Sequence, residues 1–307
     1  MGVPLPLLLD TDVGTDVDDA IAIGLLLASP EIDLRAITIV SGDVNLRGRI
    51  AKKLLLLAHR SGVLVAAGIR DPILRQRNFL WLGHEGQRIV EPEEPLPLTP
   101  THAVDLLVET LLHEPMQVAA IGPLSNLAVA IMKEPSVITS IRHLTIMGGS
   151  LGRDPQVPLL EYNLASDAEA ALVVLNAGIP TTLVPLDVTW RVFFTTGHLD
   201  RLRRTRSAFV QTLCDAIEVW APMQRAFFES APTFQRDAVV FLHDPLTLAI
   251  LIDRSLVAFE RLRLRPAIVD GIFRFVEERS APEVEVAVAV DAPRFVEFLV
   301  QRLMQLP

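Results

Sequence analysis

Residues 10–19 read Asp-Thr-Asp-Val-Gly-Thr-Asp-Val-Asp-Asp and hold five carboxylates. The apolar residues 5–9 before them predict a buried strand, and the apolar residues 20–28 after them predict a buried helix. No lysine or arginine occurs before Arg35, so no cation close in the sequence offsets these charges. The order of strand, acidic stretch and helix predicts an α/β fold whose first strand ends in the carboxylates.

This acidic stretch has two interpretations. Aspartate is favoured at helix N-termini, which explains Asp18 as a cap and Asp19 in the first turn. Capping does not explain Asp10 and Asp12, which face the same side of the strand. Crowded carboxylates repel one another unless a cation joins them, and hard divalent cations take oxygen ligands. We therefore favour a metal or catalytic site over capping alone.

The composition restricts the class of protein. The chain has 307 residues, 50% of them hydrophobic, which suits a single α/β domain over residues 1–307. Its net charge of -9 argues against nucleic acid or an anionic membrane surface as the main partner. Cys214 is the only cysteine, which suits a reducing compartment. No apolar run reaches membrane-spanning length and no signal peptide is recognised, so we expect a cytoplasmic protein.

Strand and helix patterns alternate along the chain. Strands are predicted at 34–40, 63–67, 116–121, 144–147 and 181–186, with two more near 257–264 and 283–290. This alternation predicts a mainly parallel, doubly wound sheet with helices on both faces. Ligands bind such sheets beyond the carboxyl ends of the strands, where residues 10–19 and 41–45 both fall. Residues 68–100 lack periodicity and predict a long loop, functional or mobile.

Three known motifs begin with closely spaced aspartates. An EF-hand loop needs glycine and glutamate at its sixth and twelfth positions, which hold Thr15 and Ile21. The motif D-x-D-x-[TV] of haloacid-dehalogenase-type phosphatases misses at its fifth position, Gly14. Residues 10–20 resemble the nucleoside hydrolase motif D-T-D-x-G-x-D-D-A, with Asp16–Val17 as two extra residues.

Four further segments resemble the nucleoside hydrolase family in the right order. They are Ile121-Gly122-Pro123-Leu124-Ser125-Asn126, Met147-Gly148-Gly149, Glu161-Tyr162-Asn163 with Asp167, and His243-Asp244-Pro245. Each segment is short, but the ordered set is specific and covers residues 5–250. The later lysine and acidic pair of the phosphatases have no convincing counterpart.

The resemblance implies Ca²⁺-dependent hydrolysis of the N-glycosidic bond of ribonucleosides, giving ribose and free base. The implied metal ligands are Asp12, Asp19, the carbonyl of Ile121 and Asp244. With a water and two ribose hydroxyls they reach about eight oxygens, the upper end of the calcium range. The family also implies a homodimer or homotetramer, and His243 suits its unspecific or inosine- and uridine-preferring branch.

The resemblance also implies roles in the reaction. Asp12 is expected to take the proton of the attacking water and Asp18 to bind the 2′-hydroxyl. Asn163 and Glu161 are expected to hold the 3′- and 5′-hydroxyls. His243 is expected to protonate the leaving base, because an ordinary histidine titrates near neutrality.

Several contacts with the nucleoside are less well defined. The extra pair leaves open whether Asp16 or Asp18 meets ribose. Asp43 stands where many relatives have asparagine and is expected among the substrate contacts, as are Met147 and Asp244. The segment around His84 resembles the family's loop that covers the base. The alternative is that His84 is an ordinary loop histidine. The sequence leaves the preferred base open.

Two rival functions remain. A non-catalytic calcium- or ribose-binding protein on the same fold would keep Asp12, Asp19 and Asp244. A phosphatase would use Mg²⁺ and Asp10 as its nucleophile.

Overall fold

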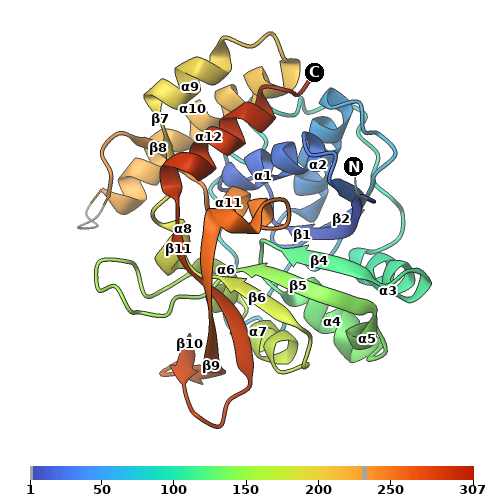
Figure 1. Cartoon of the computed structure of the whole chain (residues 1–307). Coiled ribbons are helices and arrows are strands. Elements are labelled where there is room, and N and C mark those ends of the chain that lie inside the picture. Colours follow the sequence, from blue (N-terminus) through green and yellow to red (C-terminus); the bar gives the residue numbers. More distant parts are fainter. Residues whose placement is uncertain (1–2, 230–233) are drawn as a thin grey trace.

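The computed structural model describes residues 3–229 and 234–307. A nine-stranded sheet crosses the molecule in the order β10-β9-β11-β6-β5-β4-β1-β2-β3 (Figure 1). Its strands are β1 (Leu5–Thr11), β2 (Ile32–Ile39), β3 (Leu64–Ala67), β4 (Met116–Ala120), β5 (Ile141–Met147), β6 (Thr181–Val184), β9 (Val257–Val269), β10 (Ile272–Glu277) and β11 (Glu283–Val290). The run from β6 to β3 is parallel throughout.

Helices cover both faces of the sheet, which confirms the doubly wound architecture. One face carries α1 (Asp18–Leu27), α2 (Val44–Leu57), α9 (Thr196–Arg203), α10 (Ala208–Phe228), α11 (His243–Ala249) and α12 (Ala292–Leu303). The other carries α3 (Ala103–His113), α4 (Ser125–Lys133), α5 (Val137–Ser140) and α7 (Ala168–Leu175). Short helices α6 (Tyr162–Ser166) and α8 (Leu186–Thr189) follow β5 and β6.

Strand β1 is covered by helices on both faces, which explains its continuous apolar sequence. Leu7 and Leu9 pack in the core beneath α1 and α2, whereas Leu8 packs in the core beneath α3 and α4. All three side chains are fully buried. Successive strand residues point to opposite faces, so a strand covered on both faces needs apolar residues at every position.

The edge of the sheet near the C-terminal half departs from the parallel pattern. Strand β11 pairs parallel with β6, but β9 pairs antiparallel with β11 and β10 antiparallel with β9. Strand β10 was not predicted from the sequence. Asp270 and Gly271 join β9 to β10, and both have positive φ, 52° and 77°. An Asp-Gly pair between β-rich segments is a hairpin signal, so the sequence did contain this information.

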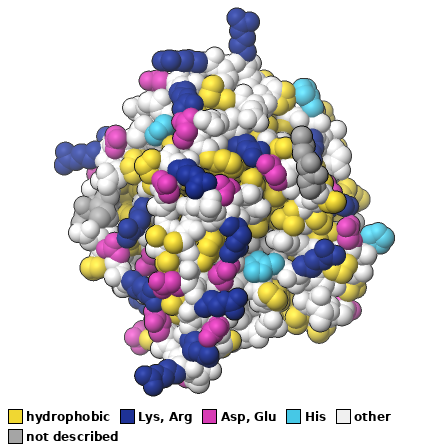
Figure 2. All heavy atoms as spheres, viewed as in Figure 1, with side chains coloured by type: hydrophobic (Ala, Val, Ile, Leu, Met, Phe, Trp, Pro, Cys, Tyr) yellow, Lys and Arg dark blue, Asp and Glu magenta, His cyan; other side chains and the backbone are white. Residues whose placement is uncertain are grey.

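Helices α9 and α10 follow the short strand β7 (Phe193–Thr195) in the chain. A small second sheet, formed by β7 (Phe193–Thr195) and β8 (Ala238–Phe241), flanks them. No helix in the described part of the chain is long and apolar enough to cross a membrane. On the face in Figure 2, basic and acidic side chains are interspersed.

Helix α1 begins differently from the prediction. Its N-cap residue is Val17, and Asp18 and Asp19 both lie in the first turn, without a side-chain capping bond. Helix α7, by contrast, has Asp167 as its N-cap, and the Asp167 side chain accepts a hydrogen bond from the Ala170 amide at 3.2 Å. Capping therefore accounts for Asp167 but not for the carboxylate of Asp18.

Gly68, directly after β3, is packed too closely to accept a side chain. A Cβ added to buried Gly68 would lie 2.3 Å from Asn126 Oδ1 and 2.5 Å from the Ile39 carbonyl oxygen. We expect Gly68→Ala to lower the free energy of unfolding by about 1–3 kcal/mol, measured in urea. Gly62→Ala is the matched control, because a Cβ there meets nothing within 4 Å. Equal stability of the two variants would contradict this packing.

Candidate active site

A cavity of about 460 Å³ opens beyond the carboxyl ends of β1, β4, β5 and β6. Its described lining consists of Asp12, Thr15, Asp16, Asp18, Asp19, Leu80, Ile121, Met147, Pro158, Leu160, Glu161, Tyr162, Asn163, Leu186, Trp190, Trp220, Phe227, Phe228, His243 and Asp244. Six of these residues carry carboxylates and none is lysine or arginine. The cavity therefore combines a strongly acidic wall with an aromatic one.

Three of the carboxylates meet although their residues lie far apart in the chain. Oxygens of Asp18, Asp19 and Asp244 all lie within 4.8 Å of one another. Helix α11 packs on α1, and the Asp244 amide donates to Asp18 Oδ2 at 3.1 Å. The Thr11 hydroxyl donates to the Asp19 carboxylate and orients it. This oxygen-only group has the chemistry that a hard divalent cation prefers.

Burial and mutual repulsion make these carboxylates hard to ionise without a cation. Burial first, and neighbouring carboxylates second, raise the pKa values of Asp18, Asp19 and Asp244 well above the usual range. The same causes raise the pKa of Asp16 to about 7. A positive ion would reverse this shift, because an opposite charge favours the ionised form. The donor set thus fits a divalent metal ion.

Asp12 lies at the same cavity, directly after β1. Burial raises the pKa of its carboxyl, while the charge of Arg47 lowers it. A Cβ on Gly122 would lie 2.7 Å from Asp12 Oδ1 and 2.9 Å from the Asp12 amide nitrogen. The glycine of the Gly-Pro-Leu-Ser-Asn segment is therefore needed to let the Asp12 carboxylate turn into the cavity.

The predicted contacts from β4 and β5 also converge. Asn163 Nδ2 donates to the carbonyl oxygens of Ile121 at 3.0 Å and Met147 at 3.2 Å. All three residues line the cavity. Asn163 therefore links the ends of two neighbouring strands and holds the Ile121 carbonyl at the edge of the acidic wall.

Glu161 lines the cavity but is also a structural cap. Its carboxylate accepts hydrogen bonds from the amides of Gly149 at 2.7 Å, Asn163 at 2.5 Å and Leu164 at 3.0 Å. Burial raises its pKa, and these backbone bonds oppose the shift. Glu161 thus joins the end of β5 to the start of α6.

His243 faces the cavity beside an aromatic group. Its ring stacks on Phe241 at 5.5 Å and on Trp190 at 6.3 Å between centroids. Its Nδ1 lies 2.8 Å from Thr189 Oγ1. Burial lowers the pKa of His243 to about 4. The shift arises because the aromatic wall excludes the water that would solvate an imidazolium.

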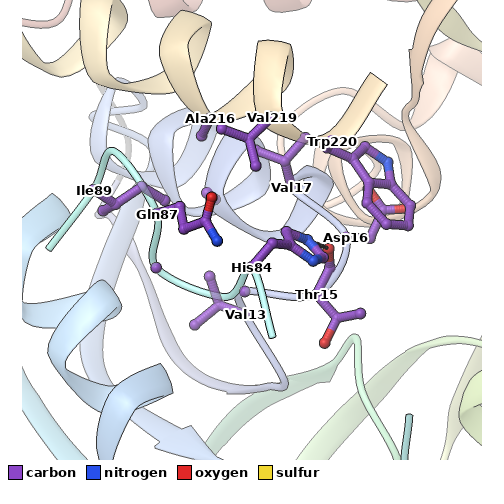
Figure 3. A pocket seen from close by; sticks show the side chains of 13 residues that line it. Val13, Thr15, Asp16, Val17, His84, Gln87, Ile89, Ala216, Val219 and Trp220 are labelled. Carbon is purple, nitrogen blue, oxygen red and sulfur yellow. Dashed lines mark hydrogen bonds between the residues drawn. The ribbon is translucent and has the colours of Figure 1, made fainter. Parts of the chain in front are cut away.

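Two predicted substrate contacts lie elsewhere. Asp43 is exposed and caps α2, accepting from the amides of Asn45 and Leu46. His84 is buried outside the main cavity, where its Nε2 donates to the Thr15 carbonyl at 2.8 Å. Its ring stacks on Trp220 at 5.6 Å (Figure 3). Neither residue lines the acidic cavity, so the geometry does not support direct contacts with substrate.

Asp10 also lies outside the cavity lining. Its Oδ2 accepts hydrogen bonds from Thr38 Oγ1 at 2.6 Å and Asn126 Nδ2 at 2.8 Å. The side chain is fully buried, and burial raises its pKa to about 7. A residue in this position is poorly placed to act as the nucleophile of a phosphatase.

Comparison with known sequences decides the family. The family described as inosine-uridine preferring nucleoside hydrolase matches residues 7–297. The chain belongs to this nucleoside hydrolase family. It is therefore a hydrolase that acts on ribonucleosides.

Individual nucleoside hydrolases resemble the chain over nearly its whole length. It is 31% identical to the pyrimidine-specific ribonucleoside hydrolase RihA of Enterobacter sp. (strain 638), over 98% of each chain. It is 33% identical to RihA of Salmonella arizonae, over 97% of this chain and 98% of that one. Among solved structures, the plant nucleoside hydrolase PpNRh1 has a TM-score of 0.85 at 28% identity, covering 98% and 99% of the chains. The purine-preferring ribonucleoside hydrolase from Gardnerella vaginalis has a TM-score of 0.85 at 25% identity, covering 98% of each.

Three residues around this candidate site were not predicted from the sequence. Thr189 and Trp190 follow β6 and hold His243, yet no motif marks them. Arg47 is fully buried against the acidic loop, which is residues 11–17, from the end of β1 to the start of α1. A signal for Arg47 did exist, because it falls on the stripe of α2 that otherwise buries apolar residues such as Ile50 and Leu54.

The raised pKa of Asp10 generates a prediction about pH. Between about pH 4 and 7 the folded protein keeps the Asp10 proton that the unfolded chain has released, so this group lowers stability as pH rises. We expect Asp10→Asn to gain stability relative to wild type from pH 5 to pH 8, by on the order of 3 kcal/mol. Urea unfolding at each pH measures this, with Asp43→Asn as the control for charge removal. Parallel pH profiles for wild type and Asp10→Asn would contradict it.

Proposed function

We propose that the protein cleaves the N-glycosidic bond of ribonucleosides in a Ca²⁺-dependent reaction that releases ribose and free base. The observation that carries this proposal is the convergence of Asp12, Asp18, Asp19 and Asp244 with His243 on one cavity. The acidic wall suits a cation and a sugar diol, and the aromatic wall suits a flat base.

The proposed metal ligands are Asp12, Asp19, the Ile121 carbonyl and Asp244. Asp18 lies within the same close group and is proposed to bind the 2′-hydroxyl. When bound, Ca²⁺ would offset the carboxylate charge, gather the ribose hydroxyls and make a nearby water more acidic. Asn163 and Glu161 remain the proposed partners of the 3′- and 5′-hydroxyls.

The residues then act on the separating charges of the reaction. As the bond between C1′ and the base nitrogen breaks, C1′ and the ring oxygen gain oxocarbenium character. Fixed carboxylates stabilise that positive charge, because they are already oriented and shielded from water. Asp12 takes one proton from the attacking water, whose oxygen bonds to C1′. The electron pair of the broken bond stays on the base nitrogen, which takes up a proton from solvent, and Asp12 afterwards releases its proton to solvent.

His243 is proposed to assist the leaving base. With a pKa of about 4 its ring is neutral at pH 7, so it carries one N–H. Thr189 holds Nδ1, which leaves Nε2 as the ring nitrogen available to the base. A neutral N–H stabilises the growing negative charge by hydrogen bonding, a weaker form of help than full protonation from an imidazolium.

Activity measurements on variants of the acidic residues test this proposal. Ribose release from inosine and uridine should require Ca²⁺ and stop with chelator. Asp12→Ala and Asp244→Ala should each lose on the order of 10³-fold or more in kcat/KM, because each removes charge from the transition state. Asp43→Ala, an exposed aspartate outside the cavity, should stay within about twofold of wild type.

The same assay separates the rival functions. A non-catalytic binding protein would bind nucleoside and calcium without releasing ribose. A phosphatase would release phosphate from a phosphate ester with Mg²⁺ and without ribose release. Normal ribose release by Asp12→Ala would reject the proposed mechanism.

A second prediction concerns His243. His243→Ala should lose about 10²-fold in kcat on inosine and uridine, which have poor leaving groups. It should lose little on 4-nitrophenyl riboside, whose phenolate leaves without a proton. His143→Ala, a histidine on β5 bonded to Thr182, is the matched control. Equal losses on both kinds of substrate would show that His243 has another role.

A cytoplasmic location stays a prediction from the composition. The family resemblance further predicts a homodimer or homotetramer that acts in purine or pyrimidine salvage.

A further inference from the structure

A single arginine lies fully buried behind the acidic wall. Arg47 has no exposed surface, and it comes from the core-facing side of α2. Its Nε donates to the Ser41 carbonyl at 2.8 Å, and its Nη2 donates to Thr15 Oγ1 at 2.8 Å. Its Nη1 donates to the Asp12 carbonyl. The guanidinium therefore ties the acidic loop to the end of β2.

Among the described residues, Arg47 forms no direct ion pair, and its charge lies against the backbone of the acidic residue Asp12. The guanidinium lies directly behind the acidic wall, because it contacts the backbone of Asp12 and the Asp12 side chain lines the cavity. Burying an arginine is costly unless negative charge lies nearby, and the same holds for buried carboxylates. Arg47 and the acidic loop therefore each reduce the cost of burying the other.

The position of Arg47 is fixed from two further sides. The Trp81 ring lies over the guanidinium, 5.3 Å from Cζ to the ring centroid. Thr15, which receives Nη2, donates in turn to Glu85 Oε1 at 3.1 Å. Glu85 belongs to the loop after β3, so the arginine is held by the acidic loop, by α2 and by this loop together.

We propose that Arg47 is a built-in counter-ion that keeps residues 11–17 in their folded arrangement before a metal ion binds. It is a positioning residue, because it touches the backbone of Asp12 and the side chain of Thr15 and does not line the cavity. Without it, the loop would depend on bound metal for its positive charge. The part of this inference that concerns calcium rests on the metal site of the proposed function.

Thermal unfolding of the full chain tests the counter-ion, in chelator and in saturating calcium. Arg47→Met should lower Tm by about 10 °C in chelator and by less than half as much in calcium. The Tm of Arg47→Lys should lie between the Tm values of Arg47→Met and wild type. If Arg47→Met does not fold, Arg47→Lys replaces it in this comparison. Lys53→Met is the matched control, because Lys53 lies on the same helix and pairs with Glu94 at 2.6 Å, away from the acidic loop. Its shift should be small and equal in both conditions.

A second Tm experiment tests the counter-ion without metal. In chelator, Asp12→Asn should raise Tm more in the Arg47→Met background than in wild type, because only Arg47→Met leaves the Asp12 carboxylate without its positive neighbour. If Arg47 only filled space, Asp12→Asn would change Tm equally in the two backgrounds, and Arg47→Met would lower Tm equally in chelator and in calcium. Either result would overturn the proposal. Failure of calcium to stabilise wild type would instead count against the proposed metal site and leave this second experiment intact.

Discussion

The mutual repulsion of buried carboxylates at the end of β1 is the constraint on which the rest of the site depends. Asp12, Asp18, Asp19 and Asp244 are buried side chains that line one cavity, and burial raises their pKa values. A protein holds such a group only if positive charge or hydrogen-bond donors hold the ionised form. Here the Thr11 hydroxyl and the Asp244 amide donate to the carboxylates, and one arginine lies behind them. The remaining negative charge is what the proposed cation and the proposed positive transition state would meet.

The family motifs consist largely of the residues that hold this arrangement together. Gly122 gives room for the Asp12 carboxylate, and Asn126 joins Asp10 to the exit of β3 through Ile69. Asp167 caps α7 and accepts from Ser125 at 2.6 Å. A match to such motifs therefore reports on the framework of the site as much as on its chemistry. That is why their order along the chain identified the family when no single motif did.

The site residues predicted from sequence divide by the kind of contact that places them. Those at strand ends, such as Asp12, Ile121 and Met147, line the cavity because parallel strands end at one edge. Asp43 does not, because its carboxylate is used to cap α2. His84 does not, because its loop turns it toward Thr15 and Trp220. The spacing of residues in the sequence does not show whether a loop side chain will bond to nearby backbone or face the cavity.

The sequence by itself determined the parallel sheet, the acidic end of its first strand and the family, because hydrophobic periodicity and short motifs are local properties. Only the tertiary structure decided that Asp244 meets Asp18 across 226 residues, that aromatic neighbours make His243 neutral, and that Arg47 stands behind the carboxylates. Charge balance and desolvation depend on what surrounds a group in space. The residues that impose them come from segments that are distant in the chain and follow no common period.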